Sequence, residues 1–433
     1  MTAHPLPRTL VSEIGRRLGE RIRLCGWAKE VRGTDDPPAI VLRDHTGTAI
    51  LVGTPLAGGD GALTDVTVES AVEATGTVTG ARGHVEVALD HLRVAGGAAQ
   101  PLPVTAASPL DERLDWRYLD LRHARNRLIF EVQTTAERAM RDFWHEQGFL
   151  EVHSPKLKPI PNKSGDQLFA VAYFGQRAWL AQSPQFYKQM AMAAGFDRVF
   201  EIGPVFRAQA DPTARHDTEF TSVDIEMSWI DGLEDLLVHE EQLLCRVLGA
   251  VRDAHAPQIS RWFSTDVRVP RMPFPRLSLA EAKKIVASTG WGVGGDADDL
   301  DAEGERRLAA HVAREHGHEF VFVTDYPDVS RPFYHMRCDE GSVETRSFDL
   351  LWKGLEITSG AQREHRYDRL VAQARARGVR VDVVHQYLDF FRYGCPPHGG
   401  FGLGLTRMLM SLFGVGDVRE VTYLFRGPDR LSP

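Results

Sequence analysis

Two strand-length segments, residues 197–209 and 220–229, alternate polar and apolar side chains, and this alternation constrains the fold more than any other feature of the sequence. Successive side chains of a β-strand point to opposite faces of the sheet. We therefore expect the two strands to pack one face on a hydrophobic core and to carry charge on the other. The face away from the core would hold Glu201, Arg207 and Gln209 from the first segment and Phe220, Ser222, Asp224, Glu226 and Ser228 from the second.

The connection between these strands is polar and contains Arg215 and His216. Two arginines and a histidine would then converge on a face that also holds carboxylates, which is typical of a phosphate site with a cation partner. The pattern alone also fits a solvated sheet face. Both interpretations stay open at this point.

The character of the chain changes near residue 104. Residues 1–104 contain short alternating runs rich in Val, Gly, Thr and Ala, which favour a small β-barrel or sandwich. Several prolines and polar residues follow and indicate a linker over 105–124. From Arg125, apolar residues recur at three- and four-residue intervals, which predicts an amphipathic helix that ends near Gly148.

Residues 125–433 would form the second domain. Its strand-like runs are broken irregularly by helices, which favours an α+β fold over a repeating βαβ arrangement. An acidic stretch rich in Gly and Asp at 295–307 predicts a surface insertion, which we place over about 240–315.

Composition excludes several classes of protein. The 433 residues carry 51 Lys and Arg against 59 Asp and Glu, and the net charge of −8 argues against a sequence-blind nucleic-acid binder. Four scattered cysteines without CxxC spacing argue against a zinc knuckle or a disulfide framework. No apolar run approaches the ~20 residues of a membrane span, and no signal peptide is evident. We expect a cytoplasmic protein without a membrane partner.

Residues 347–363 predict a hairpin around the two-residue turn Lys353-Gly354. In that register Leu351 would pair with Glu356, which would place Asp349 and Glu356 on one face as diagonal neighbours. Two adjacent carboxylates repel each other unless a cation lies between them, and a divalent ion bound to nucleotide phosphates is one remedy. A pair of solvated acids is the alternative.

Five glycines lie within residues 394–404, directly before an apolar helix that carries Arg407 on its flank. Glycines permit close approach of the backbone to a ligand, although a Gly-rich turn is weak evidence by itself. The segment lacks the GxxxxGK[ST] pattern, which excludes a P-loop.

Together these segments resemble the signature motifs of class II aminoacyl-tRNA synthetases. Phe206-Arg207 with the later Phe220 is similar to motif 2, and Gly-Leu-Gly-Leu-Thr-Arg at 402–407 is similar to motif 3. Residues 125–155, a long helix and then Gly-Phe-Leu-Glu-Val-His-Ser-Pro, resemble motif 1, the dimer element of the family. Within the class, Gln-Ser-Pro-Gln-Phe-Tyr-Lys at 182–188 and the segments 348–366 and 425–433 resemble archaeal-type aspartyl-tRNA synthetases.

This resemblance covers nearly the whole chain. It implies an N-terminal OB-fold that binds the anticodon, followed by an antiparallel sheet flanked by helices. The implied activity is aspartate-tRNA ligation, in which ATP activates aspartate to aspartyl-adenylate and the aspartyl group passes to tRNA. ATP and Mg²⁺ are the implied cofactors, and tRNA, aspartate and a second copy of the chain are the implied partners.

The resemblance also implies roles for single residues. Arg207 would hold the α-phosphate and Arg407 would stack on the adenine, which makes these two the implied catalytic residues. The ATP site would comprise Arg207, Gln209, Arg215, His216, Phe220, Glu356 and Arg407. Asp349 and Glu356 would bind the metal. The amino-acid site would comprise Gln185, Lys188, Asp224, Arg363, Ser359 and Lys163.

Within the amino-acid site, Lys188 and Arg363 would bind the side-chain carboxylate of aspartate, because an ammonium and a guanidinium favour an anion over a neutral amide. Asp224 and Gln185 would contact the ammonium group of the substrate.

Four positions depart from the family pattern. Gln209 stands where the family usually has Glu, and Lys163 aligns with a loop Glu that meets the substrate amine. Ala39 replaces an aromatic residue that stacks on the anticodon, which should weaken anticodon reading. Lys29 replaces the residue type expected to mark whether tRNA(Asn) is also charged, so that question stays open.

These departures keep two alternatives open. One is a synthetase paralogue that adenylates aspartate or a related carboxylic acid and passes it to a non-tRNA or atypical acceptor. The other is a catalytically silent binding protein, against which the retained Arg207, Asp349, Glu356 and Arg407 speak.

Overall fold

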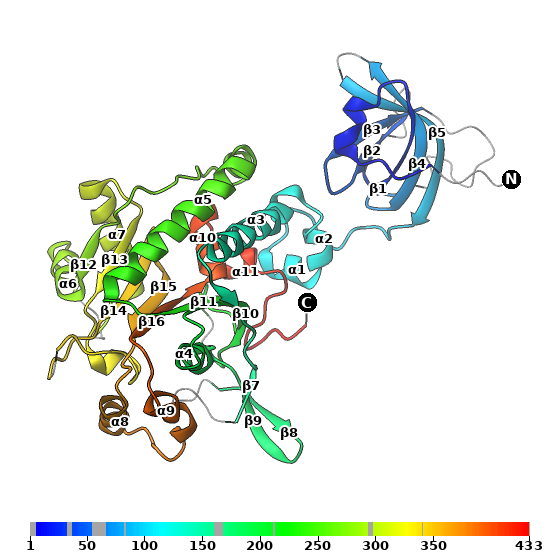
Figure 1. Ribbon diagram of the computed structural model, residues 1–433. Helices are drawn as coiled ribbons and strands as arrows, with labels where there is room; N and C mark the ends of the chain where they lie inside the picture. The colour runs from blue at the N-terminus through cyan, green and yellow to red at the C-terminus, as the bar shows by residue number, and fades with distance from the viewer. Residues whose placement is uncertain are drawn as a thin grey trace. The chain divides into compact units, whose positions relative to one another are not determined.

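The computed structural model describes residues 6–32, 37–53, 66–81, 84–159, 168–210, 213–292, 298–339 and 341–432. The chain divides into two compact units, Met1–Ala107 and Ser108–Pro433 (Figure 1). Each unit buries its own hydrophobic core, so each can be described by itself.

The first unit is a closed β-barrel with the strand order β1-β2-β3-β5-β4. Alternate apolar residues such as Ile22, Leu24 and Leu51 point into its core, and closure leaves no unpaired sheet edge. The barrel is preceded by the 3₁₀ helix η1 (Val11–Arg16), and its strands are β1 (Arg21–Arg32), β2 (Ala39–Arg43), β3 (Thr48–Val52), β4 (Ala71–Ala81) and β5 (His84–Gly96). The small barrel predicted from the sequence is confirmed.

The second unit is built on an eight-stranded sheet with the order β12-β13-β14-β15-β16-β11-β10-β6. The six inner strands are antiparallel, whereas the edge strands β12 and β6 pair in parallel with their neighbours. The strands are β6 (Leu150–Glu151), β10 (Arg198–Phe206), β11 (Glu219–Ser228), β12 (Arg276–Ser278), β13 (Phe320–Thr324), β14 (Ser347–Trp352), β15 (Leu355–Gln362) and β16 (His398–Gly404). This sheet with its helices confirms the predicted α+β fold.

A smaller three-stranded sheet, β7-β9-β8, ends in a hairpin that projects from the second unit (Figure 1). Its strands are β7 (Leu157–Lys158), β8 (Ala170–Tyr173) and β9 (Gln176–Leu180).

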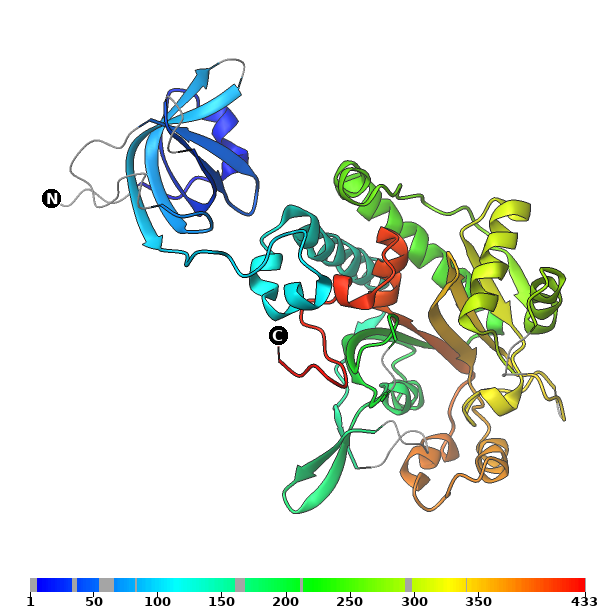
Figure 2. The same cartoon turned by 180° about the vertical axis from the view of Figure 1, so that it is seen from behind.

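Helices cover both faces of the large sheet (Figure 2). The long helices α3 and α5 pack on each other and, with α10, share the main core with one face of the sheet. Helices α4, α8 and α9 lie on the other side, around the charged face (Figure 1). The helices are α1 (Leu110–Asp115), α2 (Arg117–Asp120), α3 (Ala124–Glu146), α4 (Gln185–Ala193), α5 (Leu233–Phe263), α6 (Leu279–Ser288), α7 (Ala302–His316), α8 (Tyr367–Ala376), α9 (His385–Arg392), α10 (Leu405–Phe413) and α11 (Val418–Val421), with the 3₁₀ helix η3 (Asp328–Ser330). Within the described residues, no helix has the length and hydropathy of a membrane span.

The structure corrects the predicted linker over 105–124. This stretch contains α1 and α2, and the second compact unit begins at Ser108. The guanidinium of Arg117 is buried and donates to the carbonyl oxygens of Thr422 and Tyr423, so the stretch is part of the second unit. The polar composition of this stretch predicted a solvent-exposed linker. Arg117 is buried nevertheless, because backbone carbonyl oxygens accept its hydrogen bonds in place of water.

The predicted insertion over 240–315 also needs correction. Residues 240–263 complete helix α5, and Leu243, Leu244 and Val247 lie in the main core. The acidic stretch contributes the start of α7, where Asp301 caps the helix by accepting a hydrogen bond from the Gly304 amide.

Helix α5 carries one unusual core residue, Glu240, which is fully buried against β15 beside Thr358. Burial, together with the nearby carboxylates of Asp349 and Glu241, raises the pKa of Glu240 to about 8. The unfolded chain ionises this carboxyl near its ordinary pKa of 4.5. The contribution of Glu240 to the free energy of unfolding therefore falls as the pH rises from about 4.5 to about 8.

We expect Glu240→Gln to remove this loss of stability. Its gain over the wild type, measured by urea unfolding, should be near zero at pH 4.5 and should reach about 3 kcal/mol at pH 7. Glu234→Gln, at an exposed position in the first turn of the same helix, is the control and should show no gain that grows with pH. A pH-independent difference in Glu240→Gln would contradict the assignment.

Candidate functional site

A cavity of about 300 Å³ lies over the charged face of the large sheet. It brings together most of the residues that the sequence singled out, from segments more than 200 positions apart. Those lining it are Gln185, Lys188, Arg207, Arg215, His216, Phe220, Asp224, Glu356, Ser359, Arg363 and Arg407. Gln209 and Asp349 do not line the cavity directly, and Lys163 lies outside the described residues.

Strand register explains why these side chains converge. Glu201, Asp224, Gly402, Ser359 and Asp349 are successive Cα partners across β10, β11, β16, β15 and β14. Residues in one such row project from the same face of a sheet. The charged face predicted from two strands therefore extends across five.

Glycines on β16 keep this face open in its centre. A Cβ atom on Gly400 would lie 2.4 Å from Oε2 of Glu226, and a Cβ on Gly402 would lie 3.1 Å from Oδ1 of Asp224. The glycine-rich segment was expected to admit a ligand. The structure shows that these two glycines make room for acidic side chains of the neighbouring strand.

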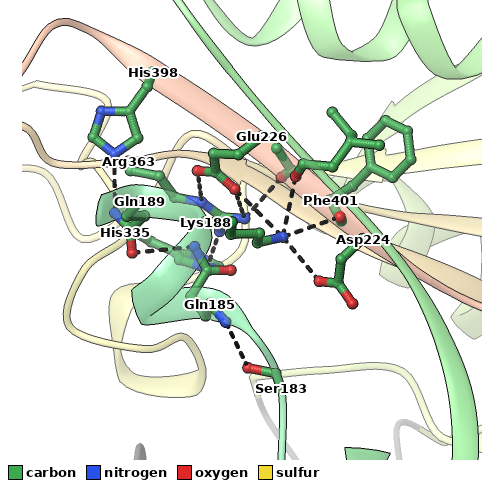
Figure 3. Close-up of polar contacts among 12 residues, drawn as sticks. Ser183, Gln185, Lys188, Gln189, Asp224, Glu226, His335, Arg363, His398 and Phe401 are labelled. Carbon is green, nitrogen blue, oxygen red and sulfur yellow. Dashed lines mark hydrogen bonds and ion pairs between the residues drawn. The ribbon is translucent and has the colours of Figure 1, made fainter. Parts of the chain in front are cut away.

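Glu226 is fully buried below the cavity and joins the two predicted cations (Figure 3). Arg363 Nε donates to Glu226 at 3.0 Å, and Lys188 Nζ lies 3.3 Å from the same carboxylate. Burial by itself would raise the pKa of Glu226, but Arg363 and Lys188 outweigh it and hold that pKa below its ordinary value. Glu226 was not predicted as a site residue, although it lies two positions after Asp224 on the same strand face.

The ammonium group of Lys188 has all three of its hydrogens engaged. It donates to Oδ1 of Asp224 at 2.9 Å and to the backbone carbonyl oxygens of Ile225 and Phe401, each at 3.1 Å. Lys188 lies one turn after Gln185 on α4 and is buried. It therefore supplies positive charge to the floor of the cavity while it fixes Asp224.

The other end of the cavity is basic. Arg407 Nη2 lies 3.1 Å from Nε2 of His216, and Nη1 of Arg407 donates to the carbonyl oxygen of Glu356 at 3.1 Å. Burial and the nearby Arg407 and Arg207 lower the pKa of His216 to about 4, so its ring is neutral at pH 7. The guanidinium of Arg207 lies 5.1 Å from the ring centre of Phe220. Arginines beside an aromatic ring suit a nucleotide.

Arg215 from the strand connection forms an ion pair with Glu305 of α7, with Nη1 and Oε2 separated by 2.8 Å. Burial and the neighbouring Glu356 raise the pKa of Glu305 to about 7. Through α7, the region predicted as an insertion therefore contacts Arg215, a residue that lines the cavity, and no local sequence signal indicated this contact.

Asp349 is held by a residue that the sequence analysis missed. The guanidinium of Arg331 binds both carboxylate oxygens of Asp349, at 2.6 and 3.1 Å, donates to Ser359 Oγ at 3.2 Å, and stacks on the ring of Tyr326. Arg331 follows η3 in an irregular segment, where neither strand nor helix periodicity predicts the direction of a side chain. The guanidinium of Arg331 thus supplies part of the positive charge that was expected beside Asp349 and Glu356.

A β-bulge brings Ser359 to the cavity. The predicted turn at Lys353-Gly354 and the pairing of Leu351 with Glu356 are confirmed, but the register then shifts by one residue. Without the shift, side chains three residues apart would point to opposite faces. Because of it, Glu356 and Ser359 both line the cavity.

The oxygens of Asp349, Glu356 and Ser359 fit a divalent cation that brings its own phosphate ligands, because Mg²⁺ usually takes one or two carboxylates and completes its shell with phosphate and water. Burial and the nearby Asp349 raise the pKa of Glu356, so a cation there would relieve an existing repulsion. Among the described residues, no group of three or more His, Cys, Asp or Glu side chains is placed to hold a metal ion. A metal ion here would therefore depend on ligands from the phosphates and from water.

Comparison with known proteins adds an independent observation. Residues 109–426 match the family described as tRNA synthetases class II (D, K and N). The chain is 41% identical over 434 residues to the aspartate--tRNA(Asp/Asn) ligase of Methanopyrus kandleri, covering 96% of this chain and 97% of that one. It is 37% identical over 440 residues to the aspartate--tRNA(Asp) ligase of Pyrococcus abyssi, covering 98% of both.

Among solved structures, the asparaginyl-tRNA synthetase of Pyrococcus horikoshii in complex with asparaginyl-adenylate superposes with a TM-score of 0.90. The two sequences are 30% identical, and the match covers 99% of this chain and 100% of the other.

The glycine at position 400 gives a direct test of the site geometry. In Gly400→Ala the new methyl group would also meet the carbonyl oxygen of Ile225 at 2.0 Å, so strand β16 or the Glu226 side chain must shift. We expect the free energy of unfolding in urea to fall by about 2 kcal/mol. Gly416→Ala, where a Cβ meets nothing within 4 Å, should change it by less than about 0.5 kcal/mol. Equal effects of the two substitutions would contradict the close packing described here.

Proposed function

The chain belongs to the class II tRNA synthetases of the D, K and N group, and we propose that it is an aspartate-tRNA ligase. It activates aspartate with ATP and transfers the aspartyl group to tRNA, as the names of its full-length relatives support. The observation that carries the choice of amino acid is the pair of cations, Lys188 and Arg363, at the floor of the cavity. The relatives do not favour the alternative of a paralogue with another acceptor.

Aspartate would lie with its side-chain carboxylate toward Arg363 and its ammonium toward Asp224 and Gln185. The second oxygen of Asp224, Oδ2, accepts a hydrogen bond from Ser222 Oγ at 2.5 Å, which fixes the carboxylate for that contact. Ser359 lies across the sheet from Asp224 with Gly402 between them and would border the same space. The α-carboxylate of the substrate would then face the basic end of the cavity.

ATP would occupy this basic end. Arg207 would hold the α-phosphate, Phe220 and Arg407 would enclose the adenine, and Arg215 and His216 would meet the outer phosphates, with Gln209 at the margin. Attack of the α-carboxylate on the α-phosphorus forms aspartyl-adenylate and releases pyrophosphate. This step needs no nucleophile from the protein, so positioning of the reactants and positive charge near the α-phosphate provide the catalysis.

Asp349 and Glu356 would hold Mg²⁺, with Ser359 as a neighbouring oxygen. When bound there, the ion supplies positive charge to the phosphate oxygens. Arg331 keeps Asp349 oriented toward this position through its two hydrogen bonds.

The N-terminal barrel would bind the anticodon of tRNA, and Ala39 at the start of β2 offers no ring on which a base could stack. Residues 125–155 would form a homodimer interface. Strand β6 within them is an edge of the large sheet, and its Leu150 is 52% exposed, which supports an interface at this edge. We place this activity in the cytoplasm.

We expect Lys188→Ala to lower kcat/KM for aspartate at least ~100-fold in ATP–pyrophosphate exchange. The substitution leaves the buried carboxylate of Glu226 without one of its two cations. Lys284→Ala, at an exposed position on α6, is the control and should retain full activity. Exchange that is absent with aspartate, or unchanged in Lys188→Ala, would count against the proposed function.

The dimer is tested by light scattering at micromolar concentration, where the wild type should have twice the mass of the chain. Leu150→Asp places a charge on the edge strand and should give a monomer. Leu18→Asp, on the exposed surface of the barrel, should leave the dimer intact. A monomeric wild type would refute the interface.

A further inference from the structure

A buried lysine on the small sheet lies behind the amino-acid site, at a position that the sequence analysis did not single out. In the two-residue strand β7, Leu157 is 46% exposed, whereas Lys158 is only 4% exposed. Burial of the apolar residue would be favourable, and a lysine is almost never buried unless its surroundings compensate its charge. This inverted placement indicates that the buried ammonium group has a role.

The ammonium group of Lys158 contacts the segment that leads into α4. Its Nζ donates a hydrogen bond of 2.8 Å to the carbonyl oxygen of Ser183. Nζ also lies 4.9 Å from the ring centre of Tyr187 and 5.8 Å from that of Phe186, and both rings belong to the first turn of α4. A cation within about 6 Å of an aromatic ring centre is attracted to the ring. Lys158 therefore contacts both the approach to α4 and its first turn.

This segment carries groups that would bind the amino acid. Ser183 and Gln185 line the cavity, and the backbone amide of Gln185 donates to Ser183 Oγ at 3.3 Å (Figure 3). Lys188 follows one turn later on the same helix and also lines the cavity. A shift at the start of α4 would displace both Gln185 and Lys188. The contacts of Lys158 oppose such a shift.

Lys158 also changes the charge balance around the amino-acid site. Three cations and three carboxylates are already joined there by ion pairs, namely Lys156, Lys188 and Arg363 with Glu201, Asp224 and Glu226. The charged form of Lys158 adds one further positive charge to this group of described residues. Aspartate carries one more negative charge than asparagine at neutral pH, so the additional charge favours aspartate.

We propose that Lys158 is a positioning residue of the amino-acid site, which in its charged form fixes the start of α4 and favours aspartate through its charge. This inference rests on the proposed function. Lys158 is not among the residues that line the cavity, so it acts through Gln185 and Lys188 rather than by contact with the substrate. A neutral amine can still donate to the Ser183 carbonyl oxygen. A charged donor makes the stronger hydrogen bond, however, and only the charged form is attracted to the rings of α4.

The surroundings of Lys158 make this charge sensitive to pH. Burial lowers the pKa of its ammonium group to about 7, and the nearby Lys156 acts in the same direction, whereas Glu201 and Asp224 oppose them. The group is therefore mostly charged at pH 6 and mostly neutral at pH 8.5. The affinity for aspartate must then fall as the pH rises through this range.

The remaining side chains packed against Lys158 are aromatic. The rings of Phe186 and Tyr187 face it from α4, and Trp179 lies opposite it on β9. Burial raises the pKa of Tyr187 above its ordinary value of 10, so its hydroxyl stays neutral between pH 6 and 8.5. These rings therefore provide a constant environment while the lysine titrates.

The test measures the affinity of the full-length protein for L-aspartate by calorimetry from pH 6 to 8.5. ATP is left out, because burial and the neighbouring Glu356 raise the pKa of Glu305, near the ATP end of the cavity, to about 7 as well. We expect Kd for aspartate to rise ~10-fold over this range as Lys158 loses its proton. Pyrophosphate exchange at saturating aspartate gives kcat separately.

Two substitutions separate the charge from the packing. Lys158→Met keeps the length of the side chain without its charge. We expect its Kd to be independent of pH and ~10-fold above the wild-type value at pH 6, with kcat changed less than about 2-fold. Lys158→Arg stays charged throughout and should keep Kd near the wild-type value of pH 6 at every pH. Lys284→Met, at an exposed position on α6, is the control and should match the wild type.

Urea unfolding distinguishes positioning from a general role in stability. Replacement of a buried charge by an apolar side chain is often neutral or stabilising. The free energy of unfolding of Lys158→Met should therefore equal or exceed that of the wild type at pH 6. Weaker binding that is accompanied by a loss of stability would contradict the proposal.

The binding and exchange measurements also separate this inference from the proposed function. Wild-type exchange with aspartate but a pH-independent Kd would overturn this inference alone, and so would a pH dependence that persists in Lys158→Met. No exchange with aspartate in the wild type would overturn the proposed function and this inference with it.

Discussion

The buried ion pairs of Glu226 hold the site together. A carboxylate without access to water is very unfavourable unless cations and hydrogen bonds compensate it. Lys188 from α4 and Arg363, which directly follows β15, provide that compensation for Glu226 on β11, across 38 and 137 positions of the chain. These contacts bind three elements into one arrangement, because loss of any member would leave an uncompensated charge in the core.

Other features of the site follow from this cluster. The close approach of β16 to Glu226 requires glycine at position 400, because a larger residue would overlap the carboxylate. Lys188 is fixed by backbone carbonyl oxygens and by Asp224, so its charge stays in the floor of the cavity. Helix α4, which carries Lys188, is also fixed through Gln189. Its Oε1 accepts a hydrogen bond from the hydroxyl of Tyr387, and its Nε2 lies 3.0 Å from Nε2 of His398. Hydrogen bonds to the backbone and to carboxylates therefore fix the charged groups of Lys188 and Arg363 in place.

Much of this could be predicted from regular elements of the sequence. Alternation in two segments placed Arg207 and Asp224 on one face, and a two-residue turn placed Glu356 opposite Leu351. The residues that were missed have a different origin. Arg331 belongs to an irregular segment in which no periodicity fixes a direction, and the contact between Arg215 and α7 depends on tertiary packing. Glu226 could have been found from its strand position, but its importance depends on partners that are distant in sequence.

The cations at the floor of the cavity are the basis on which the proposed enzyme selects aspartate over asparagine. The most direct test of this selection is calorimetric titration of the full-length protein with L-aspartate and with L-asparagine under identical conditions. The two ligands differ only in the charge and hydrogen bonding of one group. This selection predicts that aspartate binds at least ~100-fold more tightly, as expected when a buried cation pair meets an anion rather than an amide. Equal affinity for the two amino acids would contradict it.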